Sequence, residues 1–316
     1  SFTEDMAAGA QDAADDYGVS LDIFDAAAFD VSVELDEFNA ALQGGYDGIA
    51  VAPLDGERWV EPIQQAVDQG MPVVGFNVTS LGSALATWVG QDDYRSGKIL
   101  GVEALRQLTA AGVTGGVVLV GSCNPDENVL QDRDAGLREV FADTGFTLPA
   151  TRDVQLAIPD NAAAWDAIVS AHPDLVMAIG LCYIDVPNLV QIKSDQGAAW
   201  LIGGYNLDQP ALDAVTGGDA QFVIDQQEYL QGYLPVAMLA DHLIHETPLV
   251  TGWIETPVDV VNAENIDAAT AREQENQAQR DFYRAYIDAH FPDLQAAARP
   301  YQALRDLGAS QATPVP

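Results

Sequence analysis

The feature that most constrains the fold is a regular alternation of short apolar runs with amphipathic stretches. The runs are apolar throughout, which is typical of parallel strands buried on both faces. Between them, Val60, Ile63 and Val67 form one helical face, and Gly70 ends that helix. The runs that we predict as strands are 21–24, 48–52, 72–76, 116–120, 175–179, 200–203 and 220–224. About nine such strands with short turns predict two doubly wound parallel α/β sheets.

The end of the chain has a different composition. From residue 268 onward it is rich in Gln, Ala and Arg, and an aromatic stripe runs from Phe282 to Phe291 at helical spacing. The segment 268–316 carries five of the 13 basic residues against six acids, a net charge of −1. We therefore predict a helical C-terminal extension. It packs back on the acidic body or, alternatively, docks a partner.

The charge balance excludes some partners. The chain has 48 acidic and 13 basic residues, a formal charge of −35, and only Lys98 and Lys193 are lysines. Such a field repels nucleic acid and anionic membranes. The acids are scattered along the body, which suits a protein that stays soluble in molar salt, where charges are strongly screened. We predict a halophilic protein; an ordinary acidic surface is the alternative.

The sequence lacks the common motifs of enzymes and metal sites. It contains no GxGxxG, GxxxxGK[ST], GxSxG or HExxH pattern. His242 and His245 lie three residues apart without a nearby Cys or an HExxH frame, so we expect a solvated or capped pair rather than a metal site. We predict no enzymatic activity, no metal and no cofactor.

Polar residues follow several predicted strands, at the edge where open α/β sheets bind ligands. Asn77, Asn206 and Gln226 each come after a strand, and Arg133 is expected to open a helix. Amides and a guanidinium suit a polyhydroxylated ligand, and aromatic faces cover its apolar side. The aromatic candidates are Phe2, Tyr183 and Tyr205. The alternative is that each polar residue only caps a turn.

Seven segments, taken in order, resemble a known family. They are GYDGIAVAPL (45–54), MPVVGFN (71–77), WVGQDDYRSG (88–97), QDRDAGL (131–137), AHPDLVMAIG (171–180), GGYNLDQPALDAV (203–215) and VIDQQEYLQGY (223–233). Together they resemble the type I periplasmic binding proteins of the ribose-binding-like branch, in an acidic variant of the haloarchaeal type. The resemblance covers residues 1–265.

The resemblance implies a function and a topology. The function is that of an extracytoplasmic protein that delivers a sugar or a sugar-like small molecule to the membrane permease of an ABC importer. The N-terminal lobe comprises residues 1–89 and 227–254, and the C-terminal lobe comprises 90–226 and 255–267. Three hinge crossings join these lobes, and ligand binding between them favours closure. A strand is also expected before the first helix, which starts at residues 3–5, so we expect the natural chain to begin earlier.

The resemblance also implies a set of ligand contacts. The family's sugar contacts fall on Asn77, Arg133, Asn206 and Gln226, with an aromatic near Phe2. Three departures stand out. Asn77–Val78 replaces a usual Asp-Arg pair, and Asn206 replaces a usual Asp. Cys182–Tyr183 replaces a usual Asn-Asp pair, so Cys182 is also a candidate ligand contact. These changes remove acidic acceptors, so a modified or an anionic ligand is an alternative to a simple aldose.

A ligand sensor that shares the fold, such as a chemoreceptor component or a signalling-furanone receptor, is the alternative function. A DNA-binding regulator would need a basic helix-turn-helix near the N-terminus, and the first thirty residues contain none. We expect a monomer outside the cytoplasm, anchored by a lipid before residue 1 or held in a periplasm-like space.

The two cysteines follow strands that we expect to be neighbours. Cys123 follows the first strand of the second sheet and Cys182 follows the third. In a sheet of order 2-1-3-4-5 these strands are adjacent, so the cysteines can reach the Cα separation of a disulfide. An oxidising compartment would favour the bond. Two separate buried thiols are the alternative.

Overall fold

The computed structural model describes residues 2–24 and 30–300. The candidate ligand contact Phe2 is the first residue of helix α1 (Phe2–Tyr17), and its side chain lies outside the described part of the molecule. Residues 301–316 of the predicted extension also lie outside it. No helix among the described residues is both long enough and apolar enough to cross a membrane.

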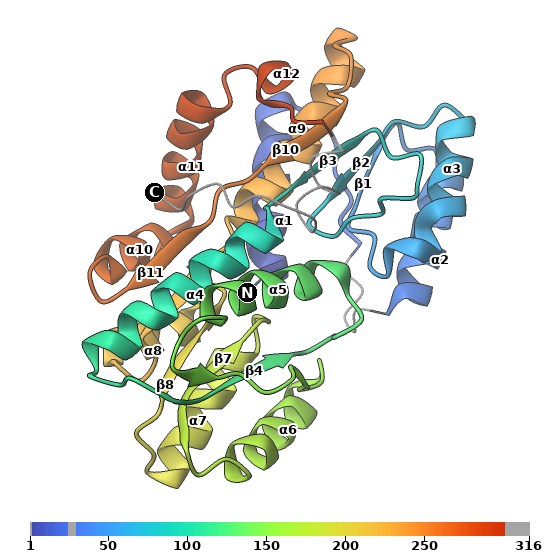
Figure 1. Cartoon of the computed structure of the whole chain (residues 1–316). Helices are drawn as coiled ribbons and strands as arrows, with labels where there is room; N and C mark the ends of the chain where they lie inside the picture. Colours follow the sequence, from blue (N-terminus) through green and yellow to red (C-terminus); the bar gives the residue numbers. More distant parts are fainter. Residues whose placement is uncertain (1, 25–29, 301–316) are drawn as a thin grey trace.

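Two β-sheets form the framework, as the alternation predicted (Figure 1). The first sheet contains β1 (Ile49–Val51), β2 (Val73–Phe76), β3 (Thr87–Gly90) and β10 (Gly252–Glu255), all parallel and in that order. The second has the order β11-β9-β8-β7-β4-β5, with β6 also paired to β4. Its strands are β4 (Gly116–Ser122), β5 (Phe146–Thr147), β6 (Arg152–Asp153), β7 (Leu175–Gly180), β8 (Leu201–Tyr205), β9 (Phe222–Asp225) and β11 (Asp259–Asn262). Among the strands of the described residues, β11 alone pairs antiparallel. The predicted strand ranges did not include β11, nor did they include β3, β5, β6 and β10.

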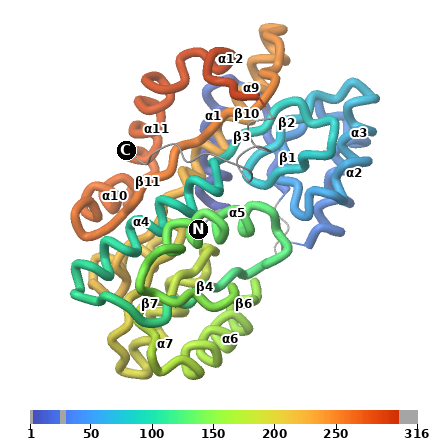
Figure 2. The backbone as a smooth tube through the Cα atoms, in the orientation of Figure 1, coloured from blue at the N-terminus to red at the C-terminus, as the bar shows by residue number. Residues whose placement is uncertain are grey.

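Helices cover both faces of each sheet (Figure 1). They are α2 (Val31–Gln43), α3 (Val60–Asp68), α4 (Asp93–Ala110), α5 (Asn128–Phe141), α6 (Ile158–Ser170), α7 (Asp185–Gln196), α8 (Gln209–Gly217) and α9 (Glu228–His245), besides α1. We call the first sheet with α1, α2, α3 and α9 the N-terminal lobe. The second sheet with α4 to α8 is the C-terminal lobe. The chain passes between the lobes after β3, after β9 and after β10, as the tube in Figure 2 shows.

Alternate strand residues fill the cores on opposite faces. In the N-terminal lobe, Val74 packs with α1 and α9, whereas its neighbour Val73 packs with α2 and α3. In the C-terminal lobe, Leu119 faces α6, α7 and α8, and Val120 faces α4 and α5. Burial on both faces explains why these strands are apolar throughout.

The prediction of a strand at residues 21–24 is wrong. This segment follows α1 but pairs with no strand among the described residues. Among the described strands, β1 pairs with β2 alone, and residues 21–24 and 49–52 both line a groove of about 260 Å³. A strand exists only where a neighbour accepts its backbone hydrogen bonds, and the apolar pattern alone does not supply one.

Helix α5 begins earlier than predicted. Its N-cap is Glu127, whose carboxylate accepts the Asn128 amide at 3.1 Å. Arg133 therefore does not open the helix but lies in its second turn. The expected helix start at 131–137 was wrong because the cap lies before those residues.

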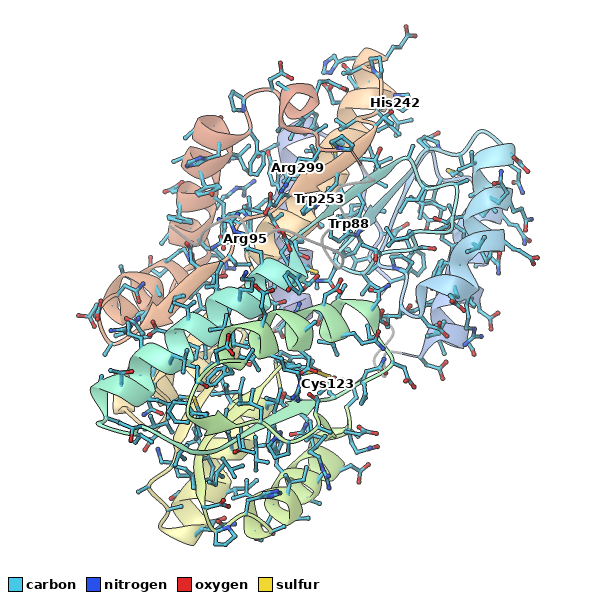
Figure 3. The ribbon with its side chains drawn as sticks, viewed as in Figure 1. Trp88, Arg95, Cys123, His242, Trp253 and Arg299 are labelled. Carbon is cyan, nitrogen blue, oxygen red and sulfur yellow. A yellow bond between two sulfur atoms is a disulfide. The ribbon has the colours of Figure 1, made fainter. Side chains whose placement is uncertain are left out.

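The C-terminal segment is helical as predicted, with α10 (Ile266–Glu273), α11 (Asn276–His290) and α12 (Leu294–Ala297). Its aromatic stripe packs back on the body, which was one of the two alternatives. Tyr283 is 2% exposed and stacks on Tyr229 of α9 at 4.3 Å between ring centroids. Figure 3 shows Arg299, which follows α12, beside Trp253 of β10.

Candidate ligand-binding site

Arg133 is the centre of a buried polar cluster between the lobes. It is only 5% exposed, and its guanidinium lies 4.3 Å over the Tyr205 ring. Nε donates to Asp93 Oδ1 at 2.7 Å, Nη1 to the Leu181 carbonyl at 3.1 Å, and Nη2 to Gln226 Oε1 at 2.5 Å. These bonds use three of the five guanidinium N–H groups. One N–H on each Nη atom therefore remains to donate to a ligand.

Two glycines bring Arg133 to its counter-ion. A Cβ atom at Gly97 of α4 would lie 2.0 Å from the Arg133 carbonyl oxygen. A Cβ atom at Gly136 of α5 would lie 2.0 Å from the Tyr94 carbonyl oxygen. The two helix backbones therefore touch, which requires glycine on both sides. This close approach sets Arg133 beside Asp93 at the start of α4.

Amide side chains continue the cluster into the N-terminal lobe. Gln226 Oε1 also accepts from Gln91 Nε2 at 3.3 Å, and the Gln226 carbonyl accepts from Gln231 Nε2 at 2.9 Å. Gln231 Oε1 in turn accepts from Asn77 Nδ2 at 2.8 Å. A chain of hydrogen bonds thus connects Asn77 in one lobe with Arg133 in the other.

The sequence reasoning missed Gln91, Asp93, Gln231 and Glu228, whose Oε1 accepts from Gln226 Nε2 at 3.3 Å. Gln91, Asp93 and Glu228 lie within three residues of the ends of β3 and β9, where the chain passes between the lobes, which was a usable signal. The two carboxylates among them were hard to single out, because acids are abundant throughout this chain.

Several polar atoms at the sheet edge of the C-terminal lobe are buried without a well-placed partner among the described residues. They are Oδ1 of Asn206, which follows β8, and Oγ of Ser122, which ends β4. Oε1 of Gln91, which follows β3 of the other sheet, is buried in the same way, and the Asn206 side chain also bonds to Asp208. Asn206 is 0% exposed and Ser122 2%. Buried polar groups are nearly always hydrogen-bonded. These donors and acceptors therefore point to a polar ligand beside Arg133.

Cys123 and Cys182 form a disulfide, with an S–S distance of 2.07 Å and a Cα separation of 6.1 Å. The two cysteines follow β4 and β7, which are adjacent parallel strands. The Cys182 sulfur, proposed as a ligand contact, is therefore bonded to Cys123, and its amide donates to Asp185 at 2.9 Å. Tyr183 follows the bridge and is half-buried. Cys123 is labelled in Figure 3.

We predict that removing this disulfide lowers stability. The bond closes a loop with a sequence separation of 59 residues, so a double Cys→Ser variant should lose about 2–4 kcal/mol in chemical denaturation. Unreduced, denatured wild-type protein should contain no titratable thiol. Two free thiols in that assay would contradict the bridge.

The lobes also touch directly on the ligand side. The Glu127 carboxylate, in the C-terminal lobe, accepts the Asp55 backbone amide at 3.1 Å. Asn128 Nδ2 donates to the Thr79 carbonyl at 3.2 Å. Both Asp55 and Thr79 belong to the N-terminal lobe, so these bonds form only when the lobes are together.

The described residues contain no group of three or more His, Cys, Asp or Glu side chains arranged to hold a metal ion. The two histidines of α9 have other partners. His242 Nδ1 lies 2.8 Å from the Thr247 carbonyl, and His245 Nδ1 lies 2.9 Å from Asp241.

Comparison with known proteins agrees with this architecture. Residues 1–247 match the family described as the periplasmic binding protein domain. The chain is 26% identical over 257 residues to the xylose/arabinose-binding protein XylF of Sulfolobus acidocaldarius, covering 75% of this chain and 62% of that protein. It is 22% identical over 250 residues to the D-ribose/D-allose-binding protein of Pseudomonas aeruginosa, covering 74% and 75%.

A solved structure extends the similarity to three dimensions. A solute-binding protein of an ABC transporter from Agrobacterium vitis, bound with α-D-tagatopyranose, superposes with a TM-score of 0.77. Its sequence identity is 23%, and the match covers 86% of this chain and 94% of that one. The fold, the order of the motifs and the matched segment lead to one assignment: this chain belongs to the periplasmic binding protein family.

Proposed function

We propose that this chain is the extracytoplasmic solute-binding component of an ABC importer and binds a neutral monosaccharide between its lobes. The observation that carries the proposal is the buried Arg133 cluster, in which three of the five guanidinium N–H groups are used, together with the buried oxygens of Asn206 and Ser122, which have no well-aligned partner among the described residues. Ring hydroxyls both donate and accept, which matches this mixture of groups. Both curated relatives named above are sugar-binding proteins.

The charges around Arg133 favour a neutral ligand over the anionic alternative. The positive charge of Arg133 already has a counter-ion in Asp93, at 2.7 Å. Burial, with neighbouring carboxylates contributing, raises the pKa of both Asp92 and Asp132 to about 6. Glu228 is also buried, at 4% exposure. A sugar acid would therefore meet surplus carboxylates and no unpaired cation.

We further propose that the three passages between the lobes act as hinges and that the lobe division is the one given by the sequence. The Glu127–Asp55 and Asn128–Thr79 bonds then act as a latch that forms on closure. The permease is proposed to recognise the closed form. This function works by binding rather than by catalysis, and a lipid anchor or a periplasm-like space would keep the protein at the cell surface.

A matched ligand panel tests the proposal. Thermal shift in about 2 M KCl, which screens the surface charge, should compare each neutral sugar with its own acid, such as xylose with xylonate and glucose with gluconate. We expect at least one neutral pentose or hexose to raise the melting temperature and its acid to have no effect. If only sugar acids or only non-sugars stabilise the protein, the proposed function is wrong.

A further inference from the structure

The C-terminal residues 266–300, which we call the strap, run from one lobe to the other on the hinge side. Helix α10 packs on α8 and β11 of the C-terminal lobe. Helix α11 packs on α9 of the N-terminal lobe through the Tyr283–Tyr229 stack. After α12, the backbone of Arg299 exchanges hydrogen bonds of 2.7 and 2.8 Å with Trp253 of β10. The family match ends at residue 247, so the strap lies beyond it.

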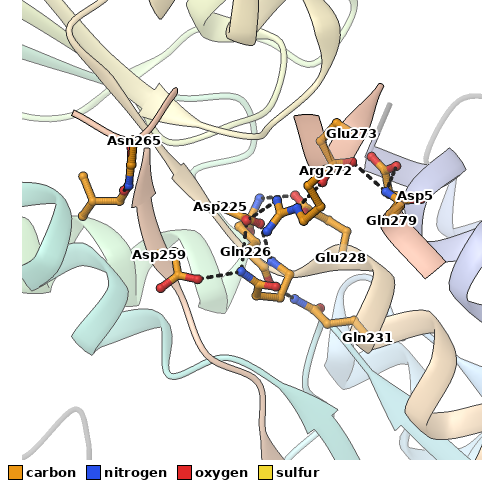
Figure 4. Close-up of polar contacts among 12 residues, drawn as sticks. Asp5, Asp225, Gln226, Glu228, Gln231, Asp259, Asn265, Arg272, Glu273 and Gln279 are labelled. Atoms are coloured by element: carbon orange, nitrogen blue, oxygen red, sulfur yellow. Dashed lines mark hydrogen bonds and ion pairs between the residues drawn. The ribbon is translucent and has the colours of Figure 1, made fainter. Parts of the chain in front are cut away.

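The strap is bonded to the passage between β9 and α9. Arg272 Nη2 donates to Asp225 Oδ2 at 2.6 Å (Figure 4). The same carboxylate accepts the Gln227 backbone amide at 2.8 Å and Gln227 Nε2 at 2.9 Å. Gln227 has a left-handed backbone with φ of 56°. Arg272 therefore binds the Asp225 carboxylate, and this carboxylate in turn fixes the turn around Gln226, which belongs to the Arg133 cluster.

Arg272 also connects the two halves of the strap. Its guanidinium lies 5.0 Å from the Phe282 ring centroid and 5.4 Å from that of Tyr283, both on α11. Its neighbour Glu273 accepts from Gln279 Nε2 at 2.6 Å, and Gln279 also donates to Asp5 of α1 at 3.2 Å. Figure 4 shows this path from the hinge to the N-terminal lobe.

A second ion pair lies at the passage after β10. Arg299 pairs with Glu255, the last residue of β10, and its guanidinium lies 4.5 Å over the Trp253 ring. Glu255 also pairs with Arg95 of α4 at 3.5 Å. One carboxylate at this passage thus pairs with a cation of the strap and with a cation of the C-terminal lobe. Figure 3 labels Arg95 and Arg299.

We infer that the strap is a conformational device that holds the lobes in the geometry described and restricts how far they open. Rotation of the lobes changes the backbone at the passages where Arg272 and Arg299 bind. Arg272 is bound to Asp225 of the C-terminal lobe, with the two side chains 10% and 2% exposed, and it also lies over the rings of α11, which packs on the N-terminal lobe. Opening therefore has to break or rearrange the contact of Arg272 with α11 and the pair between Glu255 of β10 and Arg95 of α4. The inference concerns the ligand-free protein and does not depend on which ligand binds.

The test measures the distance between the lobes without any ligand. Nitroxide labels at Glu61→Cys in α3 and Ala163→Cys in α6, both exposed sites, report that distance by double electron–electron resonance. The native cysteines are joined to each other and do not take up label. In Arg272→Ala we expect a shift to longer distances and a broader distribution. Arg106→Ala, which breaks an ion pair within the C-terminal lobe, is the matched control and should leave the distribution unchanged.

Each outcome decides the question. A longer distance in Arg272→Ala but not in Arg106→Ala supports the strap, and identical distributions for wild type and a folded Arg272→Ala overturn it. If Arg272→Ala does not fold, Arg299→Ala decides instead, because Arg299 is 40% exposed and contributes less to the core. A shift in that variant supports the inference, and no shift overturns it.

Discussion

Replacing Arg133 with Met is expected to abolish tight sugar binding and to destabilise the fold. The fold depends on this residue, because Arg133 is 5% exposed and pairs with a similarly buried Asp93. Loss of the guanidinium leaves an uncompensated buried carboxylate, which costs about 3–5 kcal/mol of the free energy of unfolding. Loss of a charge-assisted hydrogen bond to the ligand weakens binding by about 1.5–3 kcal/mol, or roughly ten- to a hundredfold.

A double variant separates these two effects. In Arg133→Met with Asp93→Asn, the buried negative charge is removed together with its partner. We expect most of the stability to return in chemical denaturation, because buried ion pairs are often replaceable by neutral groups. Sugar affinity, measured by titration calorimetry, should stay lost. Recovery of affinity along with stability would show that Arg133 supports the fold but does not contact the ligand.

Lowering the salt concentration should strongly lower the melting temperature of the protein. Among the described residues, nine Arg and Lys side chains already form ion pairs with carboxylates. Most of the 48 acids therefore have no counter-charge. Their repulsion is screened within about 3 Å in molar salt but extends about 10 Å at 0.1 M. We expect the melting temperature to fall by about 10 °C between 2 M and 0.1 M KCl, a few kcal/mol for a chain of this size.

A comparison of salts isolates the cause. Screening depends on ionic strength, so NaCl and KCl at equal concentration should have the same effect. A response to KCl alone would indicate a bound potassium ion instead. A melting temperature that does not change with either salt would contradict the halophilic interpretation.

The parts of the fold that depend on local pattern could be predicted from the sequence. Apolar runs such as 116–120 and 175–179 predicted strands because parallel strands are buried on both faces. The same reasoning failed at 21–24, since a strand also needs a neighbour in space. The strand β11 was missed because Asp259 and Asn262 at its ends interrupt the apolar pattern at the edge of the sheet.

The candidate site was predictable only in part. Asn206 and Gln226 follow strands, and chain direction alone brings them to one edge of the sheet. The contact of Arg133 with Asp93 depends on the close crossing of α4 and α5, which a single sequence does not reveal. The Arg272–Asp225 pair joins residues far apart in the chain. It could not be predicted, because any of the 48 acidic residues was an equally plausible partner for Arg272.

A crystal structure with the neutral sugar that gives the largest thermal shift tests the central claim most directly. The account predicts electron density for one sugar between the lobes, with ring hydroxyls within hydrogen-bond distance of Arg133 and Asn206. It also predicts that the Glu127–Asp55 contact is present in that complex. A sugar bound elsewhere, or bound between the lobes without contact to Arg133, would contradict the account.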